Sequence, residues 1–395
     1  YRDNSDAFSR IKLRQRVARK IDNRSVATTM VGQDVSMPVA LAPVGMTGMQ
    51  HPDGEIHAAR AAEKFGVPFT LSTMSICSIE EVAKATSKPF WFQLYVMRDR
   101  GFAADLIARA KAAGCSALVL TLDLQILAQR NKDVKNGLSA PPKPTLANMI
   151  NLAFKPTWCL GMLQTRNRTF GNIAGHVKGV EDMSSLSDWT NSQFDPTLDW
   201  ESVEWIKKHW DGPLILKGVN DVEDAKIAAG AGADAIIVSN HGGRQLDGAA
   251  ASIDMLAPIV DAVGDKIEVH LDSGIRSGMD IFKAVALGAK STFIGRAFIY
   301  GLGAAGEAGV TKALQMLRKE LVRGLSAGGN VVIPAFAVER SQELLHDIGV
   351  LLAEGALPET TVFLDSPLAK AVTEVFIKYA GSLDDVELNE RQLFR

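Results

Sequence analysis

The feature that most constrains the fold is a repeat of short apolar segments, each followed by an alanine-rich segment such as "GFAADLIARAKAAG". Most of the apolar segments lack alternating polar residues, which predicts strands that are buried on both faces. The alanine-rich segments have the spacing of amphipathic helices. The expected strands span residues 39–45, 69–73, 90–95, 117–123, 214–219, 235–240, 268–274 and 292–297.

Eight such units over about 250 residues or more predict a (β/α)8 TIM barrel, which we place at residues 1–322. A doubly wound sheet is the alternative, because periodicity does not detect closure. A long insert at about 131–212 separates the fourth strand from the fifth. It mixes apolar residues and Trp with Lys and Arg, which fits contact with a membrane surface. A cover over the active site or an oligomer contact is the other reading.

Composition and charge limit the classes of protein to which the chain can belong. The 395 residues carry a formal charge of −2, which argues against nucleic-acid binding through bulk charge. Three widely spaced cysteines predict a reducing compartment and neither a disulfide framework nor a zinc site. No apolar run approaches the roughly 18 residues of a spanning helix. We expect a cytoplasmic protein, with peripheral attachment to the inner face of the cell membrane left open. Because the chain begins at Tyr1 without a signal peptide, we also expect processing or truncation there.

Polar and glycine residues gather where the expected strands end. In a barrel of this kind those ends face the active site, so they form one set of candidate site residues. The set comprises Ser72, Gln93, Tyr95, Thr121, Asp123, Lys217, Ser239, His241, Arg244, Asp272, Arg276, Gly295 and Arg296.

The stretch "IIVSNHGGRQLDG" contains the leading candidate for a general base, His241, because imidazole titrates near neutral pH. The two glycines after it allow the backbone to approach a ligand closely. Arg244 and Arg130 suit one carboxylate, since each guanidinium can donate paired hydrogen bonds. Asp123, on the neighbouring strand end, is expected to orient the imidazole.

A phosphate-bearing cofactor is predicted at the last two strand ends. The loops after the seventh and eighth strands of a TIM barrel commonly bind phosphate, and Gly274, Arg276, Gly295 and Arg296 lie there. Lys217 fits either a Schiff-base lysine or a fixed cation beside an electron sink.

Two short motifs carry no function. "GLGAAG" at 301–306 matches a dinucleotide-binding pattern but follows the eighth strand and lacks the required acidic residue. "GLSAG" at 324–328 matches a nucleophile elbow but follows a helix instead of a strand.

Several longer motifs resemble the FMN-dependent 2-hydroxy-acid dehydrogenase and oxidase family. They are "SNHGGRQLDG", "LDSGIRSGMD", "FIGRAFIYGLGAAGEAGV", "FWFQLYVMRDR" and "DVKNGLSAPP", within about residues 8–321. The insert's "WCLGML" is similar to the lactate-oxidising bacterial branch. The resemblance implies a (β/α)8 barrel that binds FMN across the carboxyl ends of its strands, in a protein expected to form a homo-oligomer.

The resemblance also implies roles for individual residues. His241 would be the base and Asp123 its partner, with Tyr95 on the substrate oxygens and Arg130 and Arg244 on the substrate carboxylate. The implied FMN contacts are Pro43, Val44, Gly45, Ser72, Gln93, Thr121, Lys217, Ser239, Asp272, Gly274, Arg276, Gly295 and Arg296.

The expected activity is therefore oxidation of a small L-2-hydroxy acid, L-lactate to pyruvate, with electrons passing through flavin to a quinone or cytochrome. One alternative is an oxidase that uses oxygen. Another is a flavin-binding protein without turnover, because the chain departs from the family. It begins after the family's N-terminal helical segment, and Ala128 replaces a usual glycine.

The last part of the chain, 323–395, is the second departure. It is predicted to be a small α/β appendage, and "GGNVVIPAFAVERSQELL" and "VFLDSPLA" resemble the β-CASP branch of metallo-β-lactamase-fold nucleases. The metal-binding HxHxDH string of that family is absent from the sequence. We therefore expect a chimeric chain without a metal site, nuclease activity or nucleic-acid partner.

Overall fold

A computed structural model describes residues 1–15, 25–125, 135, 145–177, 193, 195–246, 248–326 and 329–331. By their internal contacts the residues form two units, Tyr1–Val331 and Val332–Arg395. The second unit lies outside the described residues, so the predicted appendage and its β-CASP likeness stay predictions.

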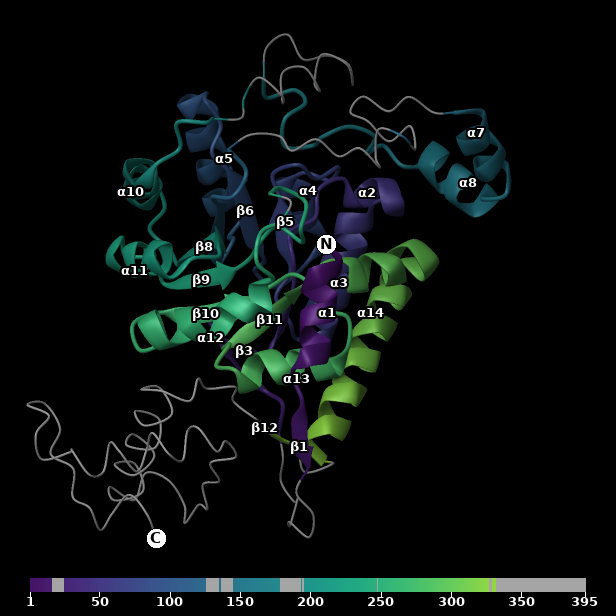
Figure 1. Cartoon of the computed structure of the whole chain (residues 1–395). Coiled ribbons are helices and arrows are strands. Elements are labelled where there is room, and N and C mark those ends of the chain that lie inside the picture. The colour runs from purple at the N-terminus through teal and green to yellow at the C-terminus, as the bar shows by residue number, and fades with distance from the viewer. Residues whose placement is uncertain are drawn as a thin grey trace, which may run out of the picture. The chain divides into compact units, whose positions relative to one another are not determined.

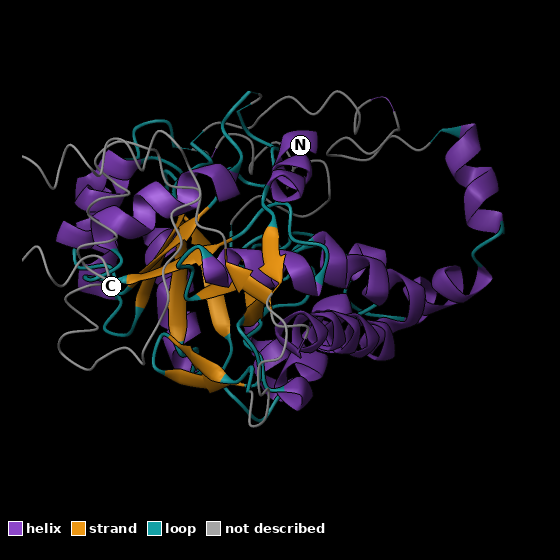
Figure 2. Ribbon diagram, turned by 60° about the horizontal axis from the view of Figure 1, so that its bottom comes forward, coloured by secondary structure: helices purple, strands orange, loops and turns teal. Residues whose placement is uncertain are grey.

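Eight parallel strands form one sheet in the order β4-β11-β10-β9-β8-β7-β6-β5. A parallel bridge between Leu41 and Phe69 joins its two edges, so the sheet closes into a barrel (Figure 2). All eight expected strands are confirmed, and closure excludes the doubly wound alternative. The strands are β4 (Val39–Leu41), β5 (Thr70–Ser72), β6 (Trp91–Tyr95), β7 (Ala117–Thr121), β8 (Leu214–Val219), β9 (Ala235–Val238), β10 (Glu268–Leu271) and β11 (Ser291–Ile294).

Helices follow the strands and pack outside the barrel (Figure 1). Most of them begin at a Ser or Asp whose side chain accepts a hydrogen bond from a backbone N–H of the first turn, as in the capping box of Ser78 and Glu81. Those between the strands are α2 (Thr47–Gln50), α3 (Gly54–Phe65), α4 (Ile79–Ala85), α5 (Arg100–Ala112), α10 (Trp200–His209), α11 (Val222–Gly230), α12 (Ser252–Val263) and α13 (Gly278–Ala286).

The core has two layers. Strand residues such as Trp91 and Phe293 fill the barrel interior, with ring centroids 5.9 Å apart. The antiparallel hairpin of β2 (Thr28–Met30) and β3 (Gln33–Val35) adds Met30, which is fully buried, to this interior cluster. The larger cluster lies between the strands and the helices. The sequence prediction did not include the hairpin.

Helix α14 (Arg296–Ser326) explains the glycine-rich "GLGAAGEAG" stretch. It bends at Ala305 and Gly306, where the backbone dihedrals are non-helical. A Cβ atom on Gly309 would lie 1.8 Å from the carbonyl oxygen of Gly301, so only glycine permits this backbone contact. The stretch is therefore a packing motif, in agreement with our rejection of dinucleotide binding.

The chain ends of the first unit also meet. Helix α1 (Arg2–Arg10) precedes β1 (Leu13–Gln15), and β1 pairs antiparallel with β12 (Gly329–Val331). Strand β12 follows α14, so this pair joins segments more than 300 residues apart in the sequence.

The described part of the insert contains two helices, α7 (Leu146–Ala153) and α8 (Pro156–Gln164). The indole nitrogen of Trp158 donates to the carbonyl oxygen of Met49 at 3.1 Å, and Thr165 Oγ1 donates to Asp53 Oδ1 at 2.7 Å. These bonds fix α8 to α2 and to the N-cap of α3. No helix in the described ranges is long and apolar enough to cross a membrane.

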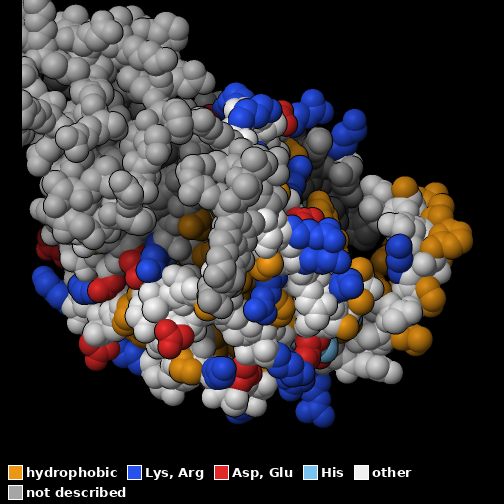
Figure 3. All heavy atoms as spheres, turned by 90° about the horizontal axis from the view of Figure 1, so that it is seen from below, with side chains coloured by type: hydrophobic (Ala, Val, Ile, Leu, Met, Phe, Trp, Pro, Cys, Tyr) orange, Lys and Arg blue, Asp and Glu red, His pale blue; other side chains and the backbone are white. Residues whose placement is uncertain are grey.

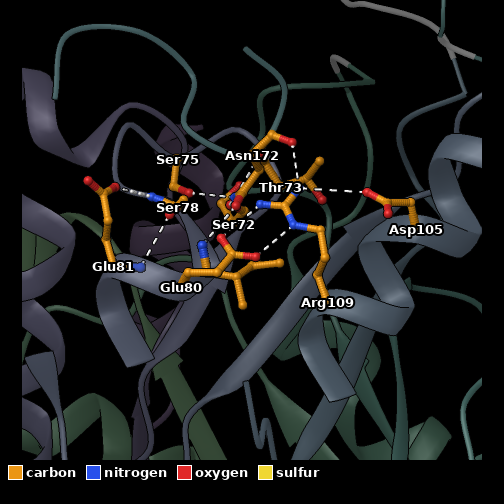
Figure 4. Close-up of polar contacts among 10 residues, drawn as sticks. Ser72, Thr73, Ser75, Ser78, Glu80, Glu81, Asp105, Arg109 and Asn172 are labelled. Carbon is orange, nitrogen blue, oxygen red and sulfur yellow. Dashed lines mark hydrogen bonds and ion pairs between the residues drawn. The ribbon is translucent and has the colours of Figure 1, made fainter. Parts of the chain in front are cut away.

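A buried amide holds the loop after β5 (Figure 4). Asn172, which is fully buried, accepts a hydrogen bond from the backbone N–H of Ile79 and donates to Ser75 Oγ, both at 2.9 Å. Arg109 donates to the carbonyl oxygen of Asn172 at 3.0 Å and forms two bonds with the Glu80 carboxylate. This network supports the β5 end, where Ser72 lies.

We expect Asn172→Ala to lower the free energy of unfolding by about 2–3 kcal/mol, because buried polar groups would lose their partners. Urea denaturation of the flavin-free protein measures this change. The exposed Asn151→Ala on α7 is the control and should change stability by less than about 0.5 kcal/mol. Equal urea midpoints for the two variants would contradict the proposed importance of the network.

Candidate active site

His241 lies in a left-handed turn directly after β9. Its φ is +57°, and Gly242 and Gly243 follow with φ of +68° and +67°. A Cβ atom on Gly243 would lie 2.6 Å from the backbone nitrogen of Tyr1, so the second glycine is required by both conformation and space. For His241 the left-handed conformation is unfavourable, and such strain is typical of functional sites.

Side-chain oxygens hold this turn. Each of its three consecutive backbone N–H groups donates to a different side chain, so the turn is fixed along its whole length. The acceptors are Ser239 Oγ for His241 (3.1 Å), Ser273 Oγ for Gly242 (2.9 Å) and Asn240 Oδ1 for Gly243 (3.0 Å).

The turn brings His241 to Asp123, as predicted. His241 Nδ1 lies 2.8 Å from Asp123 Oδ1, and both side chains are largely buried. Burial raises the pKa of Asp123, but the charge of Lys217 and the hydrogen bond with His241 outweigh this effect and lower the pKa below its usual range. An ionised Asp123 keeps the proton on Nδ1, which leaves Nε2 as the nitrogen that can accept a proton.

Lys217 is the central charge of the site. Its side chain is buried, and Nζ lies 3.0 Å from Asp272 Oδ2 and donates to Ser239 Oγ at 2.8 Å. Burial lowers the pKa of Lys217, but the charges of Asp272 and Asp123 outweigh it and raise the pKa above its ordinary value. Lys217 is therefore a permanent cation at neutral pH, and the Schiff-base reading loses support because that chemistry needs a neutral amine.

The predicted flavin-ring contacts fit a planar heterocycle with donors and acceptors on its edge. Ser72 Oγ donates to Gln93 Oε1 at 3.0 Å, which fixes the amide of Gln93. Within the described residues, the buried atoms Gln93 Nε2 and Thr121 Oγ1 have no hydrogen-bond partner. Buried polar groups rarely stay unpaired, so these atoms indicate a bound polar ligand. Pro43, Val44 and Gly45 follow β4 at the same rim.

Positive charge gathers after β10 and β11, where the sequence predicts a phosphate-binding site. The guanidinium carbons of Arg276 and Arg296 lie 5.5 and 4.4 Å from the ring centroid of Tyr1. Burial lowers the pKa of Arg296. The positive charges of Arg244 and Arg276 lower this pKa further, whereas Tyr1 raises it. Such a cluster of like charges favours an anion among them. Gly274 and Gly295 also lie in these loops.

The structure describes two of the three residues predicted to bind the substrate. Tyr95 ends β6 and pairs with Thr121 of β7, which in turn pairs with Lys217 of β8. Arg244 follows the His241 turn and is exposed. Arg130 lies outside the described residues, so its part in binding a carboxylate remains a prediction.

Sequence reasoning missed three residues that support the turn: Asn4, Asn240 and Ser273. Asn240 and Ser273 lie inside quoted motifs but at positions to which no chemistry was assigned. Ser273 has a φ of +73°, and its Oγ also donates to Asp272 Oδ1 at 2.6 Å. Asn4 lies in the polar segment at the start of the chain, where the sequence carries no periodic signal.

In the described ranges, no three His, Cys, Asp or Glu side chains gather in a group that could hold a metal ion. His270 is fully buried in β10, and its Nδ1 lies 2.8 Å from Ser291 Oγ. Burial lowers the pKa of His270 to about 3, so it is a neutral structural residue and does not compete with His241 as the base.

Comparisons with known proteins identify the family of the chain. The model of the family described as FMN-dependent dehydrogenase matches residues 1–337. The L-lactate dehydrogenase of Caulobacter sp. (strain K31) is 47% identical over 322 residues, which cover 80% of this chain and 84% of the relative. The L-lactate dehydrogenase of Acinetobacter baumannii (strain ATCC 17978) is 47% identical over 319 residues, covering 80% and 83%.

Solved structures extend the similarity. A crystal structure of the monotopic membrane protein (S)-mandelate dehydrogenase matches with a TM-score of 0.79 and 34% identity, covering 84% of this chain and 87% of that one. A mandelate oxidase variant with a C4a-OH-FMN adduct matches with a TM-score of 0.69 and 37% identity, covering 83% and 86%.

The fold and the site define a flavin-dependent oxidoreductase built on a TIM barrel. The chain belongs to the FMN-dependent dehydrogenase family, and FMN is its cofactor.

We expect Asp123→Asn to slow flavin reduction about 10²-fold, because protonated His241 would lose its stabilising charge. Stopped-flow absorbance measures this rate.

The lowered pKa of Asp123 also predicts a pH dependence of stability. Its ionised form stabilises the fold at neutral pH, and this contribution is lost as the pH falls through the folded-state pKa. The stability difference between parent and variant should therefore shrink in acid, and a difference independent of pH would contradict the assignment.

Proposed function

We propose that the chain oxidises L-lactate to pyruvate with His241 as the general base. The contact of His241 Nδ1 with Asp123 Oδ1, at 2.8 Å and at the carboxyl end of β9, carries this proposal. Identity of 47% to proteins named L-lactate dehydrogenase supports the choice of substrate. The mandelate enzymes among the structural matches support the wider class of 2-hydroxy acids.

The protein's own residues bind the acid and move its proton. Arg244 and Arg130 are the candidates for the carboxylate, and Tyr95 for the hydroxyl side. His241 Nε2 accepts the proton of the substrate, and Asp123 stabilises the imidazolium that results. When bound, FMN supplies the two-electron acceptor. Lys217 would place its fixed positive charge beside the flavin, which gains negative charge when it accepts electrons. Asp272 and Ser239 hold the ammonium group of Lys217 in place.

Residues near FMN have separate roles under this proposal. Gln93, Thr121 and Ser72 would hold the edge of the flavin ring, with the backbone of 43–45 beside it. Asp272 and Gly274 would contact the ribityl chain, and Arg276, Gly295 and Arg296 the phosphate. The unpaired Gln93 Nε2 and Thr121 Oγ1 and the arginine cluster support these assignments.

Anaerobic mixing of the FMN-loaded chain with L-lactate tests the proposal. We expect L-lactate to bleach the flavin absorbance and D-lactate to leave it unchanged. In His241→Gln, reduction by L-lactate should fall by about 10²–10⁴-fold while FMN stays bound, since general-base help has that size. A quinone analogue, a cytochrome and oxygen are then added to the reduced protein to identify the electron acceptor, which we propose is a quinone or cytochrome.

Other results would overturn the proposal. A parent protein that stays yellow under lactate would support a flavin-binding chain without turnover. Faster reduction by mandelate would place the substrate among aromatic acids, and rapid reoxidation by oxygen would define an oxidase. A His241→Gln variant that bleaches at the parent rate would remove His241 as the base.

Membrane attachment through the α7–α8 hairpin is the second part of the proposal. Leu146, Met149 and Ile150 of α7 and its C-cap residue Phe154 lie on one face by helical spacing and are 55–78% exposed. Leu160 and Leu163 of α8 are 59% and 70% exposed. Figure 3 shows hydrophobic side chains along the outer edge of the lobe at the right, where α7 and α8 lie in Figure 1. The structural match titled a monotopic membrane protein supports this assignment.

We expect the parent chain to cosediment with anionic phospholipid vesicles, and Phe154→Ser with Leu163→Ser to weaken that binding at least about tenfold, since each buried apolar side chain contributes about 1.5–3 kcal/mol. The control pair Tyr300→Ser with Met316→Ser lies on α14 and is similarly exposed, at 71% and 54%, and should bind like the parent. Loss of self-association in place of vesicle binding would instead identify the hairpin as the contact of a homo-oligomer.

A further inference from the structure

The turn that carries His241 is attached to a residue at the far end of the chain. Asn4 Nδ2 donates to Asn240 Oδ1, and Asn240 Nδ2 donates to Asn4 Oδ1, both at 2.8 Å. This reciprocal pair fixes the two amide planes relative to each other. Asn240 directly precedes His241, and Asn4 is only 3% exposed.

Every hydrogen-bonding position of the Asn240 side chain is used. Its Oδ1 also accepts from the backbone N–H of Gly243 at 3.0 Å, and its Nδ2 also donates to the carbonyl oxygen of Ala250 at 3.0 Å. An amide oxygen has two lone pairs and an amide nitrogen two protons, so no position is spare. The Gly243 N–H also donates to the backbone carbonyl oxygen of Asn240 at 3.0 Å, so a shift of the Asn240 amide moves one of the two acceptors that close the turn after His241.

Asn4 is itself firmly placed. Its Oδ1 also accepts from the backbone N–H of Ser252 at 3.3 Å, at the start of α12. Its carbonyl oxygen packs on Gly274, where a Cβ atom would lie 2.1 Å away. Lys283 of α13 donates to the carbonyl oxygen of Phe8 at 2.7 Å, which fixes the far end of α1 (Figure 1).

We propose that Asn4 is a positioning residue for proton transfer: through Asn240 it holds the left-handed turn in the one conformation that presents His241 to the substrate. The proposal rests on the assignment of His241 as the base. The turn needs such support because a non-glycine residue disfavours positive φ. The side-chain hydrogen bonds of Asn4 go to Asn240 and Ser252, so Asn4 acts on the base through Asn240.

Asn4→Ala tests the proposal in the FMN-loaded chain. We expect the rate of flavin reduction at saturating L-lactate to fall about ten- to a hundredfold, because small displacements of a catalytic group have effects of that size. Lactate affinity and FMN content should stay at parent values. In the flavin-free chain, hydrogen exchange at the Gly243 amide should become faster. A parent reduction rate in this variant would overturn the proposal.

Asn4→Asp gives a second readout that a purely structural residue would not show. An ionised carboxylate places an acceptor opposite Asn240 Oδ1, whereas the protonated acid donates to that atom and restores the pair. Burial beside an acceptor raises the pKa of the introduced group, so pairing is present at low pH and lost as the pH rises. The rate of this variant relative to the parent should therefore fall with rising pH, and the relative rate of Asn4→Ala should not change. A ratio independent of pH for Asn4→Asp would contradict the proposal.

Phe8→Leu is the control for weakened docking of α1. Phe8 is buried in the same helix and makes no side-chain bond to Asn240. We expect it to lower the unfolding temperature and to keep the parent reduction rate. Equal rate losses in Phe8→Leu and Asn4→Ala at equal loss of stability would reduce Asn4 to a structural role. If His241→Gln is inactive and Asn4→Ala is fully active, the proposed function stands and only this inference fails.

Discussion

The structure depends on closure of the parallel sheet. One bridge between Leu41 and Phe69 joins its edges, and closure gives all eight strands a single rim at their carboxyl ends. Residues from β5, β6, β7, β8 and β9 can meet there only because the sheet is closed, since an open sheet would spread the same strand ends along a line. The interior is a packed core of side chains such as Trp91 and Phe293, so the chemistry is confined to the rim.

At that rim the buried ammonium of Lys217 organises the charges. Asp272 and Asp123 raise its pKa, and its charge in turn lowers the pKa of Asp123. Asp123 then sets the proton on Nδ1 of His241. A cation in β8 is thus linked through Asp123 to His241 in the turn after β9. Ser239 joins the two parts, because its Oγ accepts from both Lys217 Nζ and the His241 backbone N–H.

The barrel and most of the rim could be predicted from the sequence because both follow simple rules. Unbroken apolar runs predict buried strands, and strand order places their polar ends together. The expected strand 117–123 ends as β7 at Thr121, because the next residues leave the ladder to form the site. The hairpin β2–β3 was missed because its two strands have three residues each, too few to show a period.

The supporting residues could not be predicted for a different reason. Asn4 and Asn240 are separated by 236 positions, and nothing in the local sequence of either indicates the other. The sequence around Ser273 does not indicate its positive φ, a conformation that is most common in glycine. Contacts of this kind depend on how elements far apart in the sequence pack against each other, and no periodic pattern in the sequence indicates that packing.

The attachment of α8 has a mechanical consequence. Trp158 and Thr165 bind it to Met49 and Asp53, a short way along the chain from the segment 43–45 that we propose lies beside the flavin. These two contacts hold α8 in one orientation relative to α2 and α3. A flexible linker would instead allow α8 many orientations. On a lipid surface contacted by α7 and α8, the barrel would keep one tilt, and every encounter with a membrane-borne electron acceptor would begin from the same geometry.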